Sequence, residues 1–471
     1  MHTGEIREKI LTARERRAAL REQCAQTGKA SLSLTLNVPG YPKSSPLLSA
    51  FFDAALVDLR RHLRAYRIAI DTAREVKQVD EAGDFYLVPL HDGRPLSDLK
   101  ALCEAFEEGH PLGRILDVDI ADNRLQPVSS QKLKLCLLCD KPAVVCMREG
   151  THPHTELREH LLSRIGRCLA DRDKRRTCRR LAELALKAIL YEITVSPKPG
   201  LVDRFEQGSH RDMDYFTFLD STAAIAARFE ELAAAGWSFT DGDLRGALPL
   251  LRAVGLEMEE AMFAATKGVN TQKGLIFLMG LALFSSARAI ARDGVLRAGS
   301  CREAIAAICR DLVRDELATA DDDATHGAAC FRRYGGEYGG VRKEAEEGLP
   351  SVFDHGLPEL EAALADAGDA AAARLNEALT RTLLRLMAVV NDTNILHRRD
   401  PATLKTVQDL AKQVLAARTE KDGRERYEQL IDCCRREYVS PGGSADLLAV
   451  TIFFYLAGLA FSAPAGEGNP S

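Results

Sequence analysis

The sequence predicts a chain of two parts, a mixed α/β domain over residues 1–180 followed by an all-α domain over residues 181–471. Three observations predict this division. Segments in which apolar and polar residues alternate lie before residue 125, a strongly basic run occupies residues 171–180, and apolar residues recur at helical spacing from residue 181 onward. A length of 471 residues fits about three domains or two large ones.

The first part mixes helices and strands. It begins with about 30 helical residues, and a long helical stretch follows at about residues 46–70. Strands are expected at residues 31–38, 84–89 and 115–120, and the first of these shows the alternation of a half-buried strand. Residues 155–180 are helical and increasingly basic. We interpret their basic end as the domain boundary, with a solvated helix face as the alternative.

The second part contains long segments rich in alanine and leucine. Its first helical pattern runs through Ala182, Leu186, Ile189, Leu190 and Ile193, and an alanine-rich helix is expected at about residues 361–379. Residues 447–463 reach the lower length limit of a membrane span, but the polar residues among them favour a buried core helix. The tail after about residue 464 is expected to be disordered.

Composition excludes some classes of partner. A net charge of -5 gives no basic excess for nucleic acid, and an aromatic content of 6% is low for a surface that stacks bases. We therefore expect no nucleic-acid and no membrane partner. The twelve cysteines are scattered, and the charged start of the chain lacks the apolar core of a signal peptide, so the sequence predicts a cytoplasmic protein.

A stiff, charged segment follows the first helix of the second part. Pro197 and Pro199 fix φ on either side of Lys198, and Asp203 and Arg204 follow closely. This segment is either a phosphate or metal site or a loop that stops the helix.

Two carboxylates share a strand in the first part. Asp117 and Asp119 are two residues apart, so they lie on one face, and Gly113 and Arg114 precede them. Paired carboxylates that hold Mg²⁺ beside a phosphate-binding arginine suit phosphoryl or nucleotidyl transfer. The alternative is an ordinary exposed strand face.

A cysteine cluster follows this strand. Cys136, Cys139 and Cys146, with His152 or His154, have the ligand types and close spacing of a Zn²⁺ site. A redox pair and a set of buried reduced cysteines are the alternatives.

Four polar motifs occur in the second part. A turn with Asn270, Thr271 and Lys273 precedes an apolar helix, which predicts either an anion site at a helix N-terminus or a plain cap. Asp321–Asp323 lie close to His326, and residues 391–398 repeat the combination of carboxylate, amide, imidazole and guanidinium. Residues 440–446 open the last helix and are expected to cap it or to bind phosphate.

Residues 181–460 resemble the triphosphoribosyl-dephospho-CoA synthase family of the citrate lyase and malonate decarboxylase systems. The motifs that carry this resemblance are Tyr191-Glu192, residues 197–204, residues 212–220, residues 268–274, residues 325–327, residues 392–398 and residues 440–446. The family usually has His at the position of Gln272 and Gly-Gly at the positions of Arg399 and Asp400. The first departure argues against an essential acid or base at position 272.

Residues 1–180 resemble the phosphoribosyl-dephospho-CoA transferase family, the citrate lyase holo-acyl-carrier-protein synthases. The motifs are residues 35–37, Pro39-Gly40, Lys43, residues 110–119 and residues 136–146. Together, the two resemblances imply a fusion of consecutive enzymes, and for the first domain we expect a nucleotidyltransferase-like fold.

The resemblances also imply substrates. The synthase would join ATP to the 2′-hydroxyl of 3′-dephospho-CoA with loss of adenine. The transferase would then place the phosphoribosyl-dephospho-CoA group on a serine of the citrate lyase acyl carrier protein, its γ subunit, and release pyrophosphate. Two alternatives remain open, a carrier-binding module with an inactive second half and an all-α enzyme similar to ADP-ribosyl hydrolases.

We assign roles to the motif residues as hypotheses. Catalysis is expected to use Asp117, Asp119, Asp203, Asp392, Asp446 and His326. Substrate binding is expected to use Lys43, Arg114, Lys198, Arg204, Asn270, Thr271, Lys273, Asn394, His397, Arg398, Ser440, Gly442, Gly443 and Ser444. Mg²⁺ ligands are expected among Asp117, Asp119, Asp322 and Asp392, and Zn²⁺ ligands among Cys136, Cys139 and Cys146.

Overall fold

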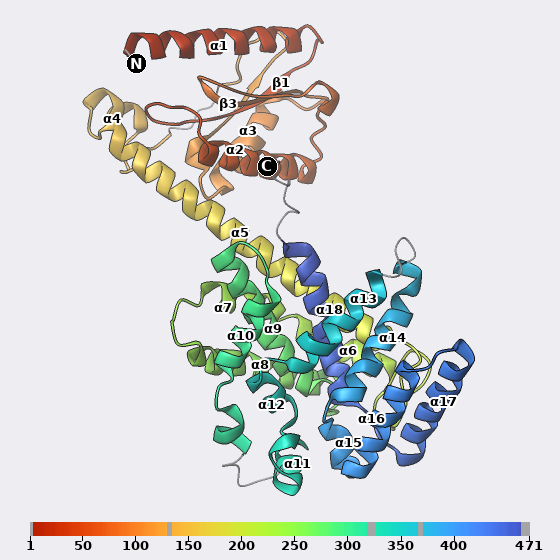
Figure 1. Cartoon of the computed structure of the whole chain (residues 1–471). Helices are drawn as coiled ribbons and strands as arrows, with labels where there is room; N and C mark the ends of the chain where they lie inside the picture. The colour runs from red at the N-terminus through yellow and green to blue at the C-terminus, as the bar shows by residue number, and fades with distance from the viewer. Residues whose placement is uncertain (1–2, 130–133, 318–325, 366–370, 463–471) are drawn as a thin grey trace, which may run out of the picture. The chain divides into compact units, whose positions relative to one another are not determined.

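The chain divides into two compact units, residues 1–173 and 174–471 (Figure 1). The computed structural model describes residues 3–129, 134–317, 326–365 and 371–462. The first unit combines helices and strands, and the described part of the second contains helices and no strand, so the broad fold class predicted from the sequence is confirmed. The tail predicted to be disordered after about residue 464 lies outside the described residues.

The division between the units falls inside one long helix. Helix α5 (His154–Thr194) runs without a break through the basic run at residues 171–180. Most side chains of that run are exposed. The run is therefore a solvated stretch of helix, and the division between the compact units also falls within it.

The first unit is built on a four-stranded antiparallel sheet with the strand order β2-β3-β1-β4. Its elements before α5 are α1 (Thr3–Ala25), β1 (Ser31–Leu36), α2 (Pro46–Ala65), β2 (Val76–Asp80), β3 (Gly83–Pro89), α3 (Leu96–Gly109), β4 (Leu116–Ala121) and α4 (Ala143–Glu149). The three predicted strands correspond to β1, β3 and β4. Strand β2 was not predicted, because Val76 and Val79 break the alternation of apolar and polar residues.

Different helices cover the two faces of this sheet. Helix α2 presents apolar residues spaced three or four apart from Leu48 to Leu63, and with α3 it covers one face. The strand residues on that face include Leu32, Leu34, Tyr86, Val88 and Val118. Helix α1 lies on the other face (Figure 1). There the guanidinium group of Arg17 donates a hydrogen bond to the carboxylate of Asp80 and stacks over the ring of Phe85.

The second unit is a bundle of helices around α9. Its elements after α5 are α6 (Tyr215–Ala226), α7 (Phe229–Ser238), α8 (Ala247–Ala265), α9 (Lys273–Asp293), α10 (Ala298–Ile308), α11 (His326–Tyr334), α12 (Gly340–Glu346), α13 (Leu357–Ala365), α14 (Ala371–Val389), α15 (Thr393–Arg398), α16 (Pro401–Leu415), α17 (Glu420–Glu437) and α18 (Gly442–Phe461). Helix α9 packs against α7, α8, α10 and α18 (Figure 1), so most of its residues are buried.

Helices α9 and α18 are long and apolar enough to cross a membrane by length and composition. In this structure, 78% and 61% of their most apolar windows are buried inside the protein. Both helices therefore have the surroundings of core helices, and residues 447–463 were predicted to form one.

Candidate active sites

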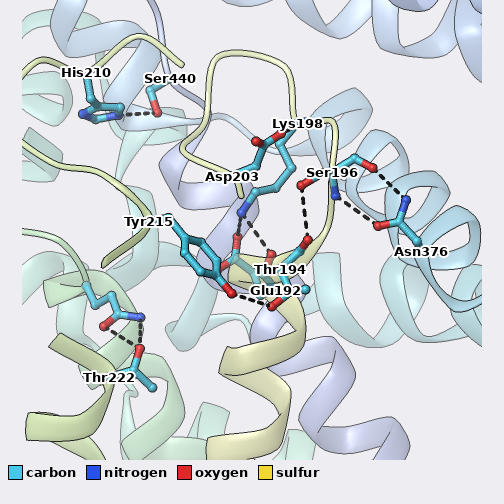
Figure 2. A network of polar contacts seen from close by, with 11 residues as sticks. Glu192, Thr194, Ser196, Lys198, Asp203, His210, Tyr215, Thr222, Asn376 and Ser440 are labelled. Atoms are coloured by element: carbon cyan, nitrogen blue, oxygen red, sulfur yellow. Dashed lines mark hydrogen bonds and ion pairs between the residues drawn. The ribbon is translucent and has the colours of Figure 1, made fainter. Parts of the chain in front are cut away.

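A tight polar loop follows α5 (Figure 2). The ammonium group of Lys198 donates to the carboxylate of Glu192 at 2.7 Å and to the backbone carbonyl of Glu192 at 3.0 Å. Both side chains are buried, so solvent does not screen this ion pair. Lys198, which was predicted to bind substrate, has a partner within the protein in this structure.

Asp203 closes the same loop. Its carboxylate accepts hydrogen bonds from the backbone N–H groups of Lys198, Phe205 and Glu206, at 3.1, 2.7 and 3.0 Å. These bonds give Asp203 a part in shaping the loop. Arg204 is exposed, and its guanidinium group lies 5.1 Å from the centre of the Phe205 ring.

Helices α15 and α18 begin close together. Asp392 precedes α15, and its carboxylate accepts hydrogen bonds from the backbone N–H of Asn394 at 3.0 Å and from the N–H and hydroxyl of Ser444 at 2.9 and 3.2 Å. A side chain on Gly442 would come within 2.8 Å of Asn394, and one on Gly443 within 3.2 Å of Asp392. The structure thus brings five predicted site residues together. Burial raises the pKa of Asp392, although its hydrogen bonds act against that effect.

Helix α9 begins beside the same region. A side chain on Gly274 would collide with the Oδ2 atom of Asp446 in α18. Asp446 has no hydrogen-bond or ion-pair partner among the described residues, and part of its surface remains accessible. Protein atoms nevertheless surround its carboxyl group, and this burial raises the pKa of Asp446 well above its usual value. The charges of Glu192 and Asp392 raise it further.

The turn before α9 is held by its own polar groups. The Oδ1 atom of Asn270 accepts a hydrogen bond from the backbone N–H of Lys273, the first residue of α9, at 3.2 Å. The hydroxyl of Thr271 donates to Ser221 at 2.7 Å, and the ammonium group of Lys273 pairs with Glu259 at 2.8 Å. Asn270 and Lys273 belong to the accessible edge of the turn.

Gln272 lies in the interior of the bundle. Its side-chain oxygen accepts a hydrogen bond from Ser221 at 2.6 Å, and its side-chain nitrogen donates to Thr222 at 3.2 Å. Both polar atoms of the amide are therefore hydrogen-bonded within the protein, so Gln272 has a structural role. This agrees with the inference that position 272 supplies no acid or base.

Two imidazole rings stack at the start of α11. His326 and His397 have ring centres 3.9 Å apart, and the Nδ1 atom of His326 lies 3.1 Å from the Oδ1 atom of Asn394. Burial lowers the pKa of His397, and the neighbouring His326 and Arg398 lower it further. A surface pocket beside the pair is lined by Ala329, Cys330, Arg332, Arg333, Tyr334, Leu396 and His397.

Ser440 has a histidine partner that the sequence analysis missed. The Nε2 atom of His210 lies 2.9 Å from the hydroxyl of Ser440 (Figure 2), and the Arg398 guanidinium lies 3.5 Å from the Nδ1 atom of the same ring. Burial, followed by the charge of Arg398, lowers the pKa of His210 to about 4. The imidazole is therefore neutral at pH 7.

In the first unit, Asp117 and Asp119 lie on one face of β4, as their spacing predicts. Lys134 pairs with Asp117, and Lys100 pairs with Asp119 at 3.2 Å. The exposed fractions of the two carboxylate side chains are 31% and 51%, so both carboxylates remain accessible to a ligand. This site is a carboxylate pair that two lysines partly neutralise.

The other candidates of the first unit lie in different surroundings. Arg114 donates to the backbone carbonyl of Leu135, and Lys43 donates to that of Val38 at 2.6 Å. Burial lowers the pKa of both side chains. The structure gathers Cys136, Cys139, Cys146 and His152 into one cluster, and His154 is not a member of it. Asp322, predicted as a metal ligand, lies outside the described residues.

The family model described as ATP:dephospho-CoA triphosphoribosyl transferase matches residues 178–463, more than half of the chain. The chain belongs to this family. A second model, described as apo-citrate lyase phosphoribosyl-dephospho-CoA transferase, matches residues 6–168. This triphosphoribosyl transferase is therefore a bifunctional transferase, a fusion of two enzymes that serve the citrate lyase prosthetic group.

Relatives of this transferase include both fused and single proteins. A protein named CitXG from Leuconostoc mesenteroides subsp. cremoris is 33% identical over 89% of this chain and 90% of its own length. A second CitXG, from Haemophilus influenzae, is 32% identical over 95% of each chain. A probable 2-(5''-triphosphoribosyl)-3'-dephosphocoenzyme-A synthase of Vibrio cholerae serotype O1 is 40% identical over 59% of this chain and 88% of its own length.

Two residues that contact the candidate site residues had no assigned role in the sequence analysis. Glu192 was noted only as part of a matching motif, and its signal is an acid inside an apolar helical pattern, directly before Ile193. His210 gave no local signal, because its partner Ser440 is 230 residues away in the sequence. Long-range partners of this kind are absent from any short motif.

Proposed function

We propose that residues 181–471 make 2′-(5″-triphosphoribosyl)-3′-dephospho-CoA and that residues 1–180 transfer its phosphoribosyl-dephospho-CoA group to the citrate lyase carrier protein. The observation that carries this proposal is that each half matches a different transferase family, over residues 178–463 and 6–168. The division of the chain into compact units at residue 173 supports the same assignment.

In the first reaction, the bond between the ATP ribose and adenine breaks, and the ribose C1″ bonds to the 2′-oxygen of 3′-dephospho-CoA. The proton of that hydroxyl leaves, and adenine departs carrying one proton. Such a displacement has an oxocarbenium-like ribose in its transition state and needs an acid for the purine and nearby negative charge for the ribose. Carboxylic groups of the second unit are well suited to both tasks.

We assign the acid to Asp446. It has no partner among the described residues, and its surroundings favour the protonated carboxyl group, which can donate to the leaving adenine. The carboxylates of Asp392 and Asp203 accept hydrogen bonds from backbone N–H groups. We therefore propose that these two residues hold the backbone of the site in place and do not take part in the chemistry. Glu192 lies near enough to influence Asp446, and its pair with Lys198 holds the loop.

The triphosphate is assigned to the region where α9 and α18 begin. Both helices direct the positive end of the helix dipole toward this region, which favours an anion. Lys273, Arg204 and Ser440 are the side chains proposed to add contacts. His210, which is neutral, holds the hydroxyl of Ser440 at 2.9 Å.

Mg²⁺ is the proposed metal of both transfer sites. The accessible carboxylates of Asp117 and Asp119 on one strand face fit its preference for oxygen ligands. Bound at such positions, Mg²⁺ would neutralise phosphate charge.

In the second reaction, a carrier serine attacks the phosphate next to the ribose, and pyrophosphate leaves. The serine proton must be accepted and the charge on the leaving group stabilised. We place this step at Asp117 and Asp119, with Arg114 near the same strand, in a nucleotidyltransferase-like arrangement. The described cysteines form no disulfide with one another. We propose that the enzyme works in the reducing cytoplasm.

Two assays test the proposal on the full chain. Purified protein with ATP, 3′-dephospho-CoA and Mg²⁺ is expected to release adenine and form a triphosphoribosyl product visible by mass spectrometry. Adding apo carrier protein should then move labelled dephospho-CoA onto it. A carrier-binding module would release no adenine, and an enzyme similar to ADP-ribosyl hydrolases would transfer the ribose to water, so either result would overturn the proposal.

The Asp446 assignment has its own test. Asp446→Asn should lower adenine release by at least about 100-fold, as expected for loss of a general acid. Stability should not fall, since the variant removes a group whose charge is disfavoured and breaks no hydrogen bond among the described residues. Wild-type turnover in this variant would remove Asp446 from the chemistry.

A further inference from the structure

Three cysteines and one histidine meet in the first unit. Cys136 and Cys139 belong to the segment before α4, Cys146 lies within α4, and His152 lies between α4 and α5. One ligand atom from each of the four residues lies within 4.8 Å of the other three. The Sγ atom of Cys139 is 3.4 Å from the Sγ atom of Cys146 and 3.4 Å from the Nε2 atom of His152.

This arrangement is close to the dimensions of a tetrahedral zinc site. Zinc binds thiolate sulfur at about 2.3 Å and imidazole nitrogen at about 2.0 Å, so ligand atoms around one ion lie roughly 3.4–3.8 Å apart. Four protein ligands fill the coordination shell, as in a structural site. The backbone N–H of Leu138 points to the sulfur of Cys136 at 3.5 Å, and Glu156 lies 3.9 Å from the Nδ1 atom of His152, where it can orient the ring.

The segment that carries the first two cysteines is a small hairpin. The backbone N–H of Cys136 donates to the backbone carbonyl of Lys141 at 2.8 Å. The backbone N–H of Ala143 donates to the backbone carbonyl of Lys134 at 2.8 Å. Leu135 and Pro142 form an isolated bridge across the hairpin. These contacts are local to the hairpin, so a metal that links it to Cys146 of α4 and to His152 would restrain it further.

The hairpin also leads to the carboxylate pair of β4. Lys134, at its start, pairs with Asp117, and the next residue, Leu135, accepts a hydrogen bond from Arg114. A restraint on the hairpin therefore fixes a lysine and an arginine beside the proposed transfer site.

We propose that Cys136, Cys139, Cys146 and His152 bind one Zn²⁺ ion and that this ion holds the hairpin of residues 134–142 in place, so that Lys134 stays on Asp117 and Arg114 on Leu135. The zinc site itself stands on the geometry of the four ligands. Its effect on group transfer rests on the proposed function of the first unit. Lys134 and Arg114 are positioned by the metal and do not bind it.

Metal analysis of the full chain tests the site. Protein purified without chelators is expected to contain about one zinc per chain and, after exchange, to bind Co²⁺ with the thiolate charge-transfer absorption of a tetrahedral site. Cys139→Ser and His152→Ala should lose the metal. His154→Ala, two residues away, and Cys168→Ser, in the same unit, are the matched controls and should keep it.

Three results would overturn the site: no zinc and no Co²⁺ spectrum in wild-type protein, a Cys139–Cys146 disulfide in its place, or equal metal loss in His154→Ala. Because a ligand variant can fail to fold, zinc is also removed from wild-type protein with a chelator and restored, and circular dichroism checks the fold. Removal should lower carrier labelling at least tenfold and leave adenine release unchanged. Unchanged labelling in zinc-free protein would overturn the positioning role, whereas wild-type protein that holds zinc and never labels the carrier would contradict the proposed function alone.

Discussion

The carboxylate of Asp392 accepts hydrogen bonds from both the backbone N–H and the hydroxyl of Ser444, at 2.9 and 3.2 Å, although 52 residues separate the two in the sequence. This contact joins the start of α15 to the start of α18. Asp392 is also bonded to the N–H of Asn394, so its oxygens are occupied by groups of the protein. The residue is therefore a link between two helix N-termini.

Asp392→Asn should destabilise the second unit. An amide can replace one carboxylate oxygen, but its NH₂ group would then face a buried N–H donor, and such a mismatch costs about 1–3 kcal/mol in the free energy of unfolding. The fluorescence of Trp237, the single tryptophan and a residue of α7, reports unfolding of this unit. Asp432→Asn is the control, since Asp432 is exposed and should shift stability by less than about 0.5 kcal/mol. Unchanged stability in Asp392→Asn would contradict the linking role.

Gly274→Ala should disturb the site by way of Asp446. The added methyl group would collide with the Oδ2 atom of Asp446, so the carboxyl group or the start of α9 must move. We expect adenine release to fall at least tenfold, because even a small displacement of a reacting group is costly. Gly280→Ala lies on the same helix, where its methyl group would meet Leu232 at an ordinary 3.8 Å, and it should keep activity. Equal activity in the two variants would argue against a catalytic Asp446.

His210 should make the stability of the second unit depend on pH. Its pKa is about 4 in the folded protein and about 6.5 in an unfolded chain. Between these values the unfolded state binds the extra proton, so stability is lost as the pH falls from 6.5 toward 4, by at most about 3 kcal/mol. His210→Gln, which keeps a neutral hydrogen-bonding side chain, should flatten this slope when Trp237 fluorescence is followed in urea at each pH. Identical slopes in the two proteins would contradict the assignment.

The sequence predicted the elements whose signals are local. Strand β1 was found from its alternating residues, and the shared face of Asp117 and Asp119 follows from strand geometry alone. Strand β2 pairs only with β3, and its mixed sequence carries no alternation. The motif residues of the second unit were identified as candidates, but their partners were not. The pairs Asp392–Ser444 and His210–Ser440 are created by packing between segments that are distant in the sequence.

Two full-length variants that each lack one of the two activities should together carry out both reactions when they are mixed. The double variant Asp117→Asn and Asp119→Asn loses the accessible carboxylates of β4, so it should release adenine at the wild-type rate but leave the carrier unlabelled. Asp446→Asn should fail in adenine release yet keep the transfer step. Because the intermediate is a diffusible small molecule, the two full-length variants in one tube should label the carrier. Full-length chains are used because separate halves would require a cut inside α5. Labelling by the double variant alone, or its loss of adenine release, would contradict the assignment of one reaction to each half. Failure of the mixture with both single steps intact would show instead that the intermediate does not pass between molecules.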